Sequence, residues 1–172
     1  DTEHLFRPGM NVADLGSAPG SWTQIVRERL TDKNGELKGR IIAMDILPME
    51  PIDGVTFLQG DFREQEVADK LNEILGGDKL DVVISDMAPN LSGIAMVDAN
   101  ASLLLNELAL DFAVEHLKPE GVFVTKAFQG SGYSQFIENC KKHFVSVAQR
   151  KPEASRNSSA EMYVVARRLK QK

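Results

Sequence analysis

Short apolar stretches alternate along the chain with longer amphipathic stretches. The apolar stretches predict strands at Asn11–Leu15, Arg40–Asp45, Val55–Gln59, Leu80–Ser85, Gly121–Ala127, Phe144–Gln149 and Met162–Ala166. Helical spacing of apolar positions predicts helices at Ser21–Leu30, Glu64–Leu75, Asn100–Leu117 and Ser134–His143. Turn signals such as KNGELKG, GGDK and KPEG lie between these segments. The alternation predicts an α/β fold.

The predicted strands also indicate how the sheet is arranged. Several are continuous apolar runs, such as VVI at 82–84, which is typical of parallel strands covered on both faces. We therefore expect a single doubly wound α/β domain over residues 1–172. The last two predicted strands are joined through KPEASRNSSAE, without a helix for a crossover. This pair is predicted to be antiparallel.

Composition narrows the class of protein. The chain has 172 residues, of which 42% are apolar and 26% charged, as in globular proteins. No apolar run reaches the length of a membrane span, and DTEHLFRPG lacks a signal-peptide core. The single cysteine, Cys140, excludes an internal disulfide and is predicted to be a packed, unreactive thiol. We expect a cytoplasmic protein with no membrane partner and, because its histidines are scattered, no metal site.

Charge is distributed unevenly along the chain. The net charge is −5, which alone argues against a nucleic-acid partner. However, residues 1–140 carry 11 Lys and Arg against 23 Asp and Glu, whereas residues 141–172 carry nine against two. Because salt screens charges beyond about 8–10 Å, a basic zone on an acidic body can still bind phosphates. The alternative is a solvated, charged C-terminal end.

The segment VADLGSAPGSW indicates a cofactor site. An apolar run reaches Asp14, and a turn with Gly16, Pro19 and Gly20 leads into a predicted helix. Such a turn presents backbone N–H groups and a carboxylate to a nucleotide-like cofactor. The G-x-G-x-x-G pattern is absent, and Pro19 removes an N–H donor, so S-adenosylmethionine suits the turn better than NAD. An ordinary turn between a strand and a helix is the alternative.

Aspartates lie at or near the ends of four consecutive predicted strands: Asp14, Asp45, Asp61 and Asp86. Ligands of open α/β sheets bind outside these carboxyl ends. Asp45 is placed to accept hydrogen bonds from ribose hydroxyls, and Asp61 to meet an adenine amino group. Asp14 is predicted to stabilise the turn or accept an N–H near the cofactor rather than to catalyse. Helix capping is the alternative, most plausibly for Asp61.

Lys126 lies inside the apolar run VFVTKAF, where a lysine is costly unless it is paired. Asp86, at the end of the preceding strand, is the natural partner if the two strands are neighbours. Glu161, directly before MYVVA, is a third candidate. Together they predict a catalytic group. A structural ion pair at the sheet edge is the alternative.

The strings DLGSAPGSW, MDILPM, QGDF, SDMAPN, FVTKAFQG, KPEASR and AEMYVVA, in this order and spacing, resemble the FtsJ-type ribosomal RNA ribose 2′-O-methyltransferases over essentially the whole chain. The resemblance implies the Rossmann-like S-adenosylmethionine-dependent methyltransferase fold. That fold has a seven-stranded, mostly parallel sheet whose last strand is antiparallel. It also implies methyl transfer to a ribose 2′-hydroxyl. In bacterial members this ribose belongs to a uridine in the A-loop of large-subunit ribosomal RNA.

The resemblance also assigns roles to individual residues. Positions that bind cofactor in the family match Gly20, Trp22, Asp45, Asp61 and Asp86. Asp86, Lys126 and Glu161 match three members of the family's catalytic Lys-Asp-Lys-Glu group. The first lysine of that group would precede Asp1. We therefore expect a truncated, processed or incompletely described form that binds S-adenosylmethionine but methylates poorly, which a methyl-transfer assay on ribosomal particles would test.

Lys126 is the expected central group of the reaction, because a 2′-hydroxyl needs its oxygen polarised or its proton accepted. We expect Lys126 to hold the hydroxyl, with its deprotonation by Lys126 left open, and Asp86 and Glu161 to orient Lys126. Lys126 is a base only if neutral. Burial lowers its pKa, whereas Asp86 and Glu161 raise it, and the sequence leaves the balance open.

The expected partner is ribosomal RNA within the large subunit, bound by a monomer. Lys151 and Arg156 are candidates for phosphate contacts. Tyr133 and Phe128 can stack on a splayed base, and Trp22 can cover the cofactor, although each aromatic residue fits the core equally well. The alternatives are another RNA such as tRNA, a weakly active cofactor-binding module, a small-molecule methyltransferase or a non-catalytic nucleotide-binding module. An NAD oxidoreductase is disfavoured by the missing glycine pattern.

Overall fold

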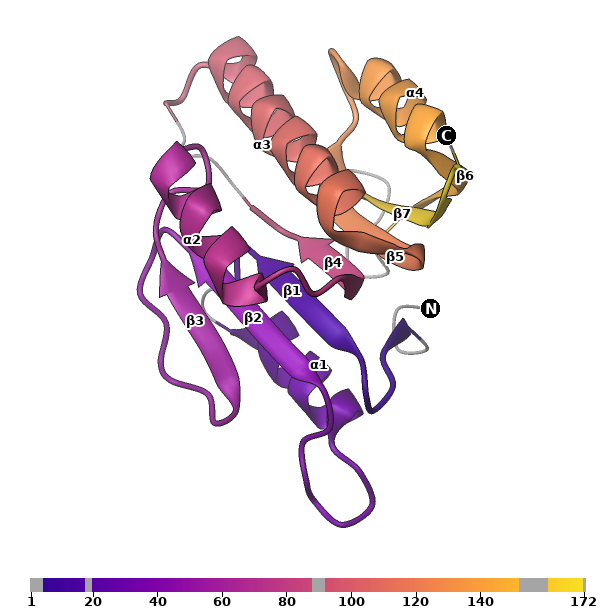
Figure 1. Cartoon of the computed structure of the whole chain (residues 1–172). Coiled ribbons are helices and arrows are strands. Elements are labelled where there is room, and N and C mark those ends of the chain that lie inside the picture. Colours follow the sequence, from indigo (N-terminus) through magenta and orange to yellow (C-terminus); the bar gives the residue numbers. More distant parts are fainter. Residues whose placement is uncertain (1–4, 18–19, 88–91, 152–160, 172) are drawn as a thin grey trace.

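The computed structural model describes residues 5–17, 20–87, 92–151 and 161–171. Helices and strands alternate along most of the chain, as predicted (Figure 1). The strands are β1 (Asn11–Leu15), β2 (Arg40–Asp45), β3 (Val55–Gln59), β4 (Leu80–Ser85), β5 (Leu117–Phe128), β6 (Phe144–Arg150) and β7 (Glu161–Leu169). The helices are α1 (Ser21–Leu30), α2 (Gln65–Leu75), α3 (Ala95–His116) and α4 (Tyr133–His143).

The strands form one seven-stranded sheet in the order β3-β2-β1-β4-β5-β7-β6. The pairs from β3 to β5 are parallel, and β7 is antiparallel to both of its neighbours. This confirms the mostly parallel sheet with an antiparallel last strand. The direction of winding reverses between β1 and β4, so their carboxyl ends flank the crevice where doubly wound folds bind ligands.

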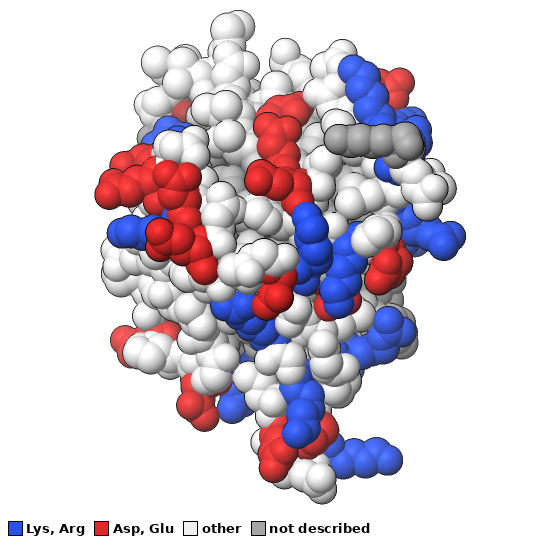
Figure 2. All heavy atoms as spheres, in the orientation of Figure 1, with Lys and Arg blue, Asp and Glu red and all other residues white. Residues whose placement is uncertain are grey.

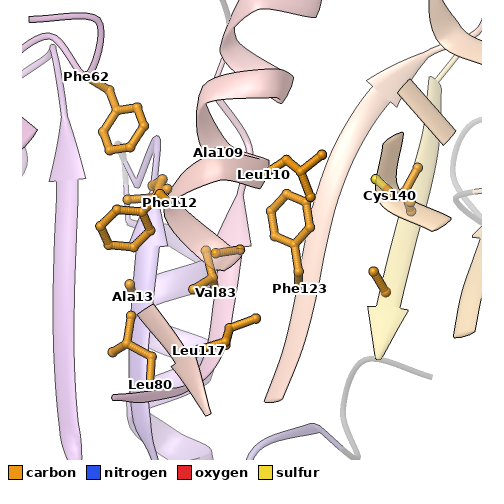
Figure 3. Close-up of a cluster of buried hydrophobic side chains, with 14 of the residues drawn as sticks. Ala13, Phe62, Leu80, Val83, Ala109, Leu110, Phe112, Leu117, Phe123 and Cys140 are labelled. Atoms are coloured by element: carbon orange, nitrogen blue, oxygen red, sulfur yellow. The ribbon is translucent and has the colours of Figure 1, made fainter. Parts of the chain in front are cut away.

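The sheet is covered on both faces. Helices α2, α3 and α4 pack on one face, and α1 with residues 5–10 packs on the other (Figure 1). Alternate residues of the central strands contribute to the two buried clusters. In the larger cluster, Phe123 of β5 lies against Leu110 of α3 (Figure 3). This core fixes the strand ends from which the candidate site is built.

Helix α3 begins at Ala95, earlier than the predicted Asn100. The backbone N–H groups of Ser92 and Gly93 donate to the Asp98 carboxylate, which stabilises the start of the helix. The first turns contain exposed apolar side chains, and the buried positions of the helix begin only at Leu105. The sequence pattern missed these turns because a helix without a buried face gives no periodic signal.

Strand β5 is also longer than predicted. The KPEG segment, interpreted as a turn, lies within β5, and this prediction was wrong. Leu117 pairs with Leu80 of β4, and the register shifts before Val82 pairs with Val122. The Lys118 ammonium also lies 3.1 Å from the Asp81 carboxylate of β4. Residues 118–121 therefore form an irregularity within β5, where four residues lie opposite the single residue Asp81 of β4.

Cys140 is fully buried in α4 beside the larger core cluster. Burial raises the pKa of its thiol to about 12, so the thiolate is absent at neutral pH. The prediction of a packed, unreactive thiol is confirmed. Among the described segments, no helix is long and apolar enough to cross a membrane.

Candidate active site

Three predicted residues from neighbouring strands converge at the carboxyl end of β5. The Lys126 Nζ atom lies 2.8 Å from the Asp86 Oδ1 atom and 3.7 Å from the Glu161 Oε1 atom. Asp86 directly follows β4, and Glu161 begins β7, so the strands on both sides of β5 supply the acids. All three side chains are partly exposed, at 21–31%. The structure therefore places a charged group where a substrate can reach it.

The environment of Lys126 favours the ammonium form. Burial alone would lower the pKa of Lys126, but the hydrogen bond and the negative charge of Asp86, together with Glu161, outweigh it and raise the pKa. Lys126 is therefore a cation and a hydrogen-bond donor at neutral pH. This resolves the balance that the sequence left open.

A second Lys–Asp pair joins the same two strands at their other end. Lys118 and Asp81 lie at the amino ends of β5 and β4, where the Lys118 Nζ atom is 3.1 Å from the Asp81 Oδ1 atom. An ion pair between these strands is thus not by itself evidence of catalysis. The location of Lys126 favours a catalytic role, because the carboxyl ends of the strands form the ligand-binding edge.

Tyr163 is a site residue that the sequence interpretation missed. It is the cross-strand neighbour of Lys126, and its ring meets Trp22 edge to face with centroids 6.2 Å apart. Burial, followed by the charge of Asp86, raises the pKa of its hydroxyl. Trp22 thus lies beside the Lys126 group and packs against the smaller core cluster. The spacing of Glu161 and Tyr163 by two residues on one strand is the signal that could have identified Tyr163.

A pocket of about 480 Å³ opens at the carboxyl ends of β1, β2 and β3. Its lining includes the predicted cofactor residues Gly16, Asp45 and Asp61. Residues that the sequence interpretation did not select also line it: Met44, Ile46, Gly60, Phe62, Arg63, Met87 and Leu105. The pocket therefore combines strand-end carboxylates with apolar walls.

The two carboxylates of this pocket differ in their contacts. Asp45 ends β2, and its Oδ1 atom accepts the Leu47 N–H at 2.9 Å. Arg63 binds Asp61 with two nitrogens, the shorter contact being 2.7 Å. The hydrogen bond from Arg63 lowers the pKa of Asp61. Asp61 does not cap α2, whose N-cap is Glu64, so helix capping is not its role here.

Asp14 lies fully buried on β1. Its Oδ2 atom accepts a hydrogen bond of 2.6 Å from the Thr23 hydroxyl of α1, whereas Oδ1 has no partner among the described residues. Burial raises the pKa of Asp14 to about 7, and the nearby Asp86 and Asp45 charges act in the same direction. Asp14 therefore ties the first turns of α1 to the strand beside the pocket.

The predicted glycines of the turn occupy positions with positive φ. Gly20 is the N-cap of α1, with φ +117°. Gly16 follows β1 with φ +80°, and a Cβ added there would lie 2.7 Å from the Met87 backbone nitrogen. The turn thus approaches the backbone after β4 closely enough to exclude any side chain. Pro19 lies outside the described residues.

Replacing Gly16 with alanine is expected to lower stability by about 2 kcal/mol and to weaken S-adenosylmethionine binding at least ten-fold, because the backbone beside the pocket must move. Gly35→Ala is the matched control, since Gly35 also has φ +80° but open space around it. Urea unfolding and calorimetric titration measure the two effects. Equal losses in both variants would show that backbone strain, not the close contact, dominates.

The basic C-terminal zone divides between the two ends of the sheet. Arg150, Tyr163 and Lys126 are paired across β6, β7 and β5, so Arg150 and the following Lys151 lie at the end that carries the Lys126 group. Other exposed basic residues lie at the ends of α4 and β7, at the opposite edge of the sheet: Lys141, Lys142, Arg168 and Lys170. The predicted Arg156 is outside the described residues. Only part of the zone can therefore serve the candidate site directly.

Comparisons with known proteins agree with this architecture. Residues 1–169 match the family model of FtsJ-like methyltransferases. The chain is 55% identical to ribosomal RNA large subunit methyltransferase E of Bordetella petrii, covering 99% of this chain and 81% of that protein. It is 51% identical to the protein of the same name from Cupriavidus necator, covering 99% and 80%.

Solved structures extend the comparison. A Plasmodium falciparum protein described as a candidate ribosomal RNA methyltransferase aligns with TM-score 0.82 and 30% identity over 100% of this chain and 93% of that chain. A Streptococcus mutans protein solved with S-adenosylhomocysteine aligns with TM-score 0.61 over 97% and 91%, and at 13% identity it shows the shared fold alone. With the family match over nearly the whole chain, the protein belongs to the FtsJ-like methyltransferase family.

Proposed function

We propose that the protein transfers a methyl group from S-adenosylmethionine to a ribose 2′-hydroxyl of large-subunit ribosomal RNA. The resemblance implies a uridine of the A-loop as the target. The observation that carries the proposal is the Lys126 ammonium, fixed between Asp86 and Glu161 at the ligand-binding edge of a methyltransferase fold. The names of relatives that are 51–55% identical support ribosomal RNA as the substrate.

We propose that S-adenosylmethionine binds at the pocket at the ends of β1 to β3, where strand-end carboxylates meet apolar walls. Gly16 lines this pocket, and its lack of a side chain lets the turn after β1 pack against the Asp86–Met87 backbone, which brings the two strand ends together at the pocket. Asp45 is placed to accept hydrogen bonds from ribose hydroxyls. Asp61 would accept a hydrogen bond from the adenine amino group, which would compete with Arg63 for its carboxylate. When bound, the cofactor supplies an electrophilic methyl group on a sulfonium.

Lys126 holds and polarises the ribose oxygen. As an ammonium it donates a hydrogen bond to the 2′-oxygen. This bond fixes the direction of attack, and correct orientation of the reacting atoms supplies a large part of the rate of group transfer. The 2′-hydroxyl must lose its proton as its oxygen gains a methyl group. That proton passes to a carboxylate, and Asp86 and Glu161 are the two beside Lys126. Lys126 therefore acts as a positioning cation rather than as the base.

We also propose that the protein acts as a monomer in the cytoplasm. One chain supplies both the pocket and the Lys126 group. Arg150 and Lys151 are the described basic residues best placed to contact RNA phosphates next to this group.

Mapping of ribose methylation in total RNA tests the proposal. Cells that lack the protein are expected to lose one 2′-O-methyl group from large-subunit ribosomal RNA, and the gene should restore it. Purified large subunits from those cells should then accept a methyl group from S-adenosylmethionine in the presence of the protein. Loss of a modification in tRNA instead, or an unchanged map, would overturn the assignment of the substrate.

A further inference from the structure

A second pocket lies between α3 and the loop that connects β5 to α4. It is open to solvent and spans about 740 Å³, and its walls include Ser102, Leu103, Asn106, Phe128, Tyr133 and Phe136. None of these residues takes part in the cofactor pocket. Phe128 is 41% exposed, which is unusual for a large apolar side chain beside an active site.

The second pocket adjoins the reaction centre. The Lys126 Nζ atom lies 6.0 Å from the centroid of the Phe128 ring, which is also part of the pocket wall. On α3, Leu105 lines the cofactor pocket and the next residue, Asn106, lines the second pocket. The cofactor pocket and the second pocket therefore flank the same part of α3. A ribose oxygen at Lys126 places its own base within reach of Phe128.

Packing and hydrogen bonding preform the aromatic walls. The Tyr133 hydroxyl donates a 2.6 Å hydrogen bond to Gln149 of β6, which fixes its ring. Gly132 has φ +86°, and a Cβ added there would lie 2.5 Å from a Leu103 methyl group. The loop therefore packs directly on α3. A preformed apolar site binds a flat ring at a lower entropic cost than one that must assemble.

The charge of the residues that line the second pocket indicates whether a base or a phosphate binds there. Among the described residues that line this pocket, none is Lys or Arg, and Asp98 carries the negative charge; the Lys126 ammonium lies beside the pocket but not in its lining. The Ser92 and Gly93 N–H groups already hold its carboxylate. The surface at the upper end of this face, where α3 begins, is also largely uncharged (Figure 2). These walls disfavour a phosphate and favour a neutral aromatic ring.

We propose that this second pocket binds the base of the nucleotide whose ribose is methylated, stacked on Phe128. The proposal rests on the proposed RNA methyltransferase function. Recognition of RNA commonly uses bases splayed out of the strand and stacked on aromatic side chains. The polar groups of Ser102 and Asn106 are available at the walls to contact the edge of the base.

Filling the pocket tests the proposal without removing a buried side chain. Ala99 is an exposed residue of α3 that lines the pocket, so Ala99→Phe is expected to weaken binding of a synthetic RNA hairpin around the methylated nucleotide by about ten-fold. Asn100→Phe is the matched control, since Asn100 is exposed, adjacent and not part of the pocket lining. S-adenosylmethionine affinity should remain unchanged in both variants.

A double-mutant cycle identifies the occupant. Phe128→Ala and an abasic target nucleotide are each expected to weaken hairpin binding by about ten-fold, with no further loss when they are combined. Additive losses, or coupling to an abasic site at a flanking nucleotide, would overturn the proposal. If the unmodified protein binds no hairpin and methylates no RNA, the proposed function itself fails. If it does both but the cycle shows no coupling, only the assignment of the second pocket fails.

Discussion

Replacing Lys126 with alanine is expected to lower the rate of methyl transfer to RNA by about 10²–10³-fold. This loss is typical when a preorganised group that stabilises a reacting oxygen is removed. The Asp86 and Glu161 carboxylates would remain, but no cation would hold the 2′-oxygen between them. Because Lys126 does not line the cofactor pocket, S-adenosylmethionine affinity should change by less than about three-fold. Single-turnover assays and calorimetric titration measure the two quantities.

Lys118→Ala is the matched control for this variant. It removes a lysine from the same strand and breaks a similar pair with Asp81, at the opposite end of the sheet. We expect a small loss of stability and an unchanged rate. Equal effects of the two substitutions on the rate would contradict a catalytic role for Lys126 and favour a structural ion pair.

The pH dependence of the rate distinguishes a positioning cation from a base. Asp86 and Glu161 raise the pKa of Lys126, so the ammonium persists to a higher pH than in a free lysine. The rate of the unmodified protein should therefore not increase as pH rises towards the usual pKa of lysine. A rate that increases with pH through that range would show that the neutral amine is the reactive form.

The ends of the strands were the part of the site that the sequence predicted well. An apolar strand that contains Lys126 requires a nearby acid, and the alternation of strands and helices left Asp86 as the nearest candidate. The structure places the two side chains 2.8 Å apart. The need of a lysine in an apolar strand for an acidic partner and the arrangement of the strands both lead to this contact, because parallel strands bring their carboxyl ends to one edge of the sheet.

Other features depend on contacts between distant segments. The KPEG segment favours a turn locally, but it becomes an irregularity within β5, because the residues on both sides of it, Leu117 and Val122, pair with β4. Tyr163 becomes a site residue only because β7 pairs with β5 and places it opposite Lys126. The basic zone appears continuous in the sequence, yet α4 and the antiparallel β7 distribute it between opposite edges of the sheet. Periodicity alone cannot supply such pairings.

Three of the strand-end aspartates show why residue type alone does not define a role. Arg63 lowers the pKa of Asp61, whereas burial raises the pKa of Asp14. Asp86 instead pairs with a lysine. These differences come from burial for Asp14, from Arg63 for Asp61 and from Lys126 for Asp86, and the sequence spacing of the three acids contains no signal for them.

Replacing Asp14 with asparagine is expected to stabilise the cofactor-free protein above neutral pH. In the folded protein Asp14 titrates at about 7, against its usual 3.8, so between these values the folded state binds more protons than the unfolded chain. The stability contributed by this group is therefore complete at low pH and is lost as pH rises to about 7. Asparagine cannot ionise, so the advantage of Asp14→Asn should grow by about 2–3 kcal/mol from pH 5 to pH 8.

Urea unfolding of both proteins at the two pH values measures this difference and cancels the other titrating groups. Asp61→Asn is the control, and it should lower the free energy of unfolding at both pH values instead of raising it. The reason is that the pKa of Asp61 is lowered, so the fold favours its ionised form. S-adenosylmethionine is cationic at its sulfonium, so Asp14→Asn should also weaken cofactor binding, by about ten-fold. A variant that gains stability and keeps full cofactor affinity would show that the buried charge has no function in the site. A variant without the pH-dependent gain would show that Asp14 is already ionised in the fold, with a partner for its Oδ1 atom.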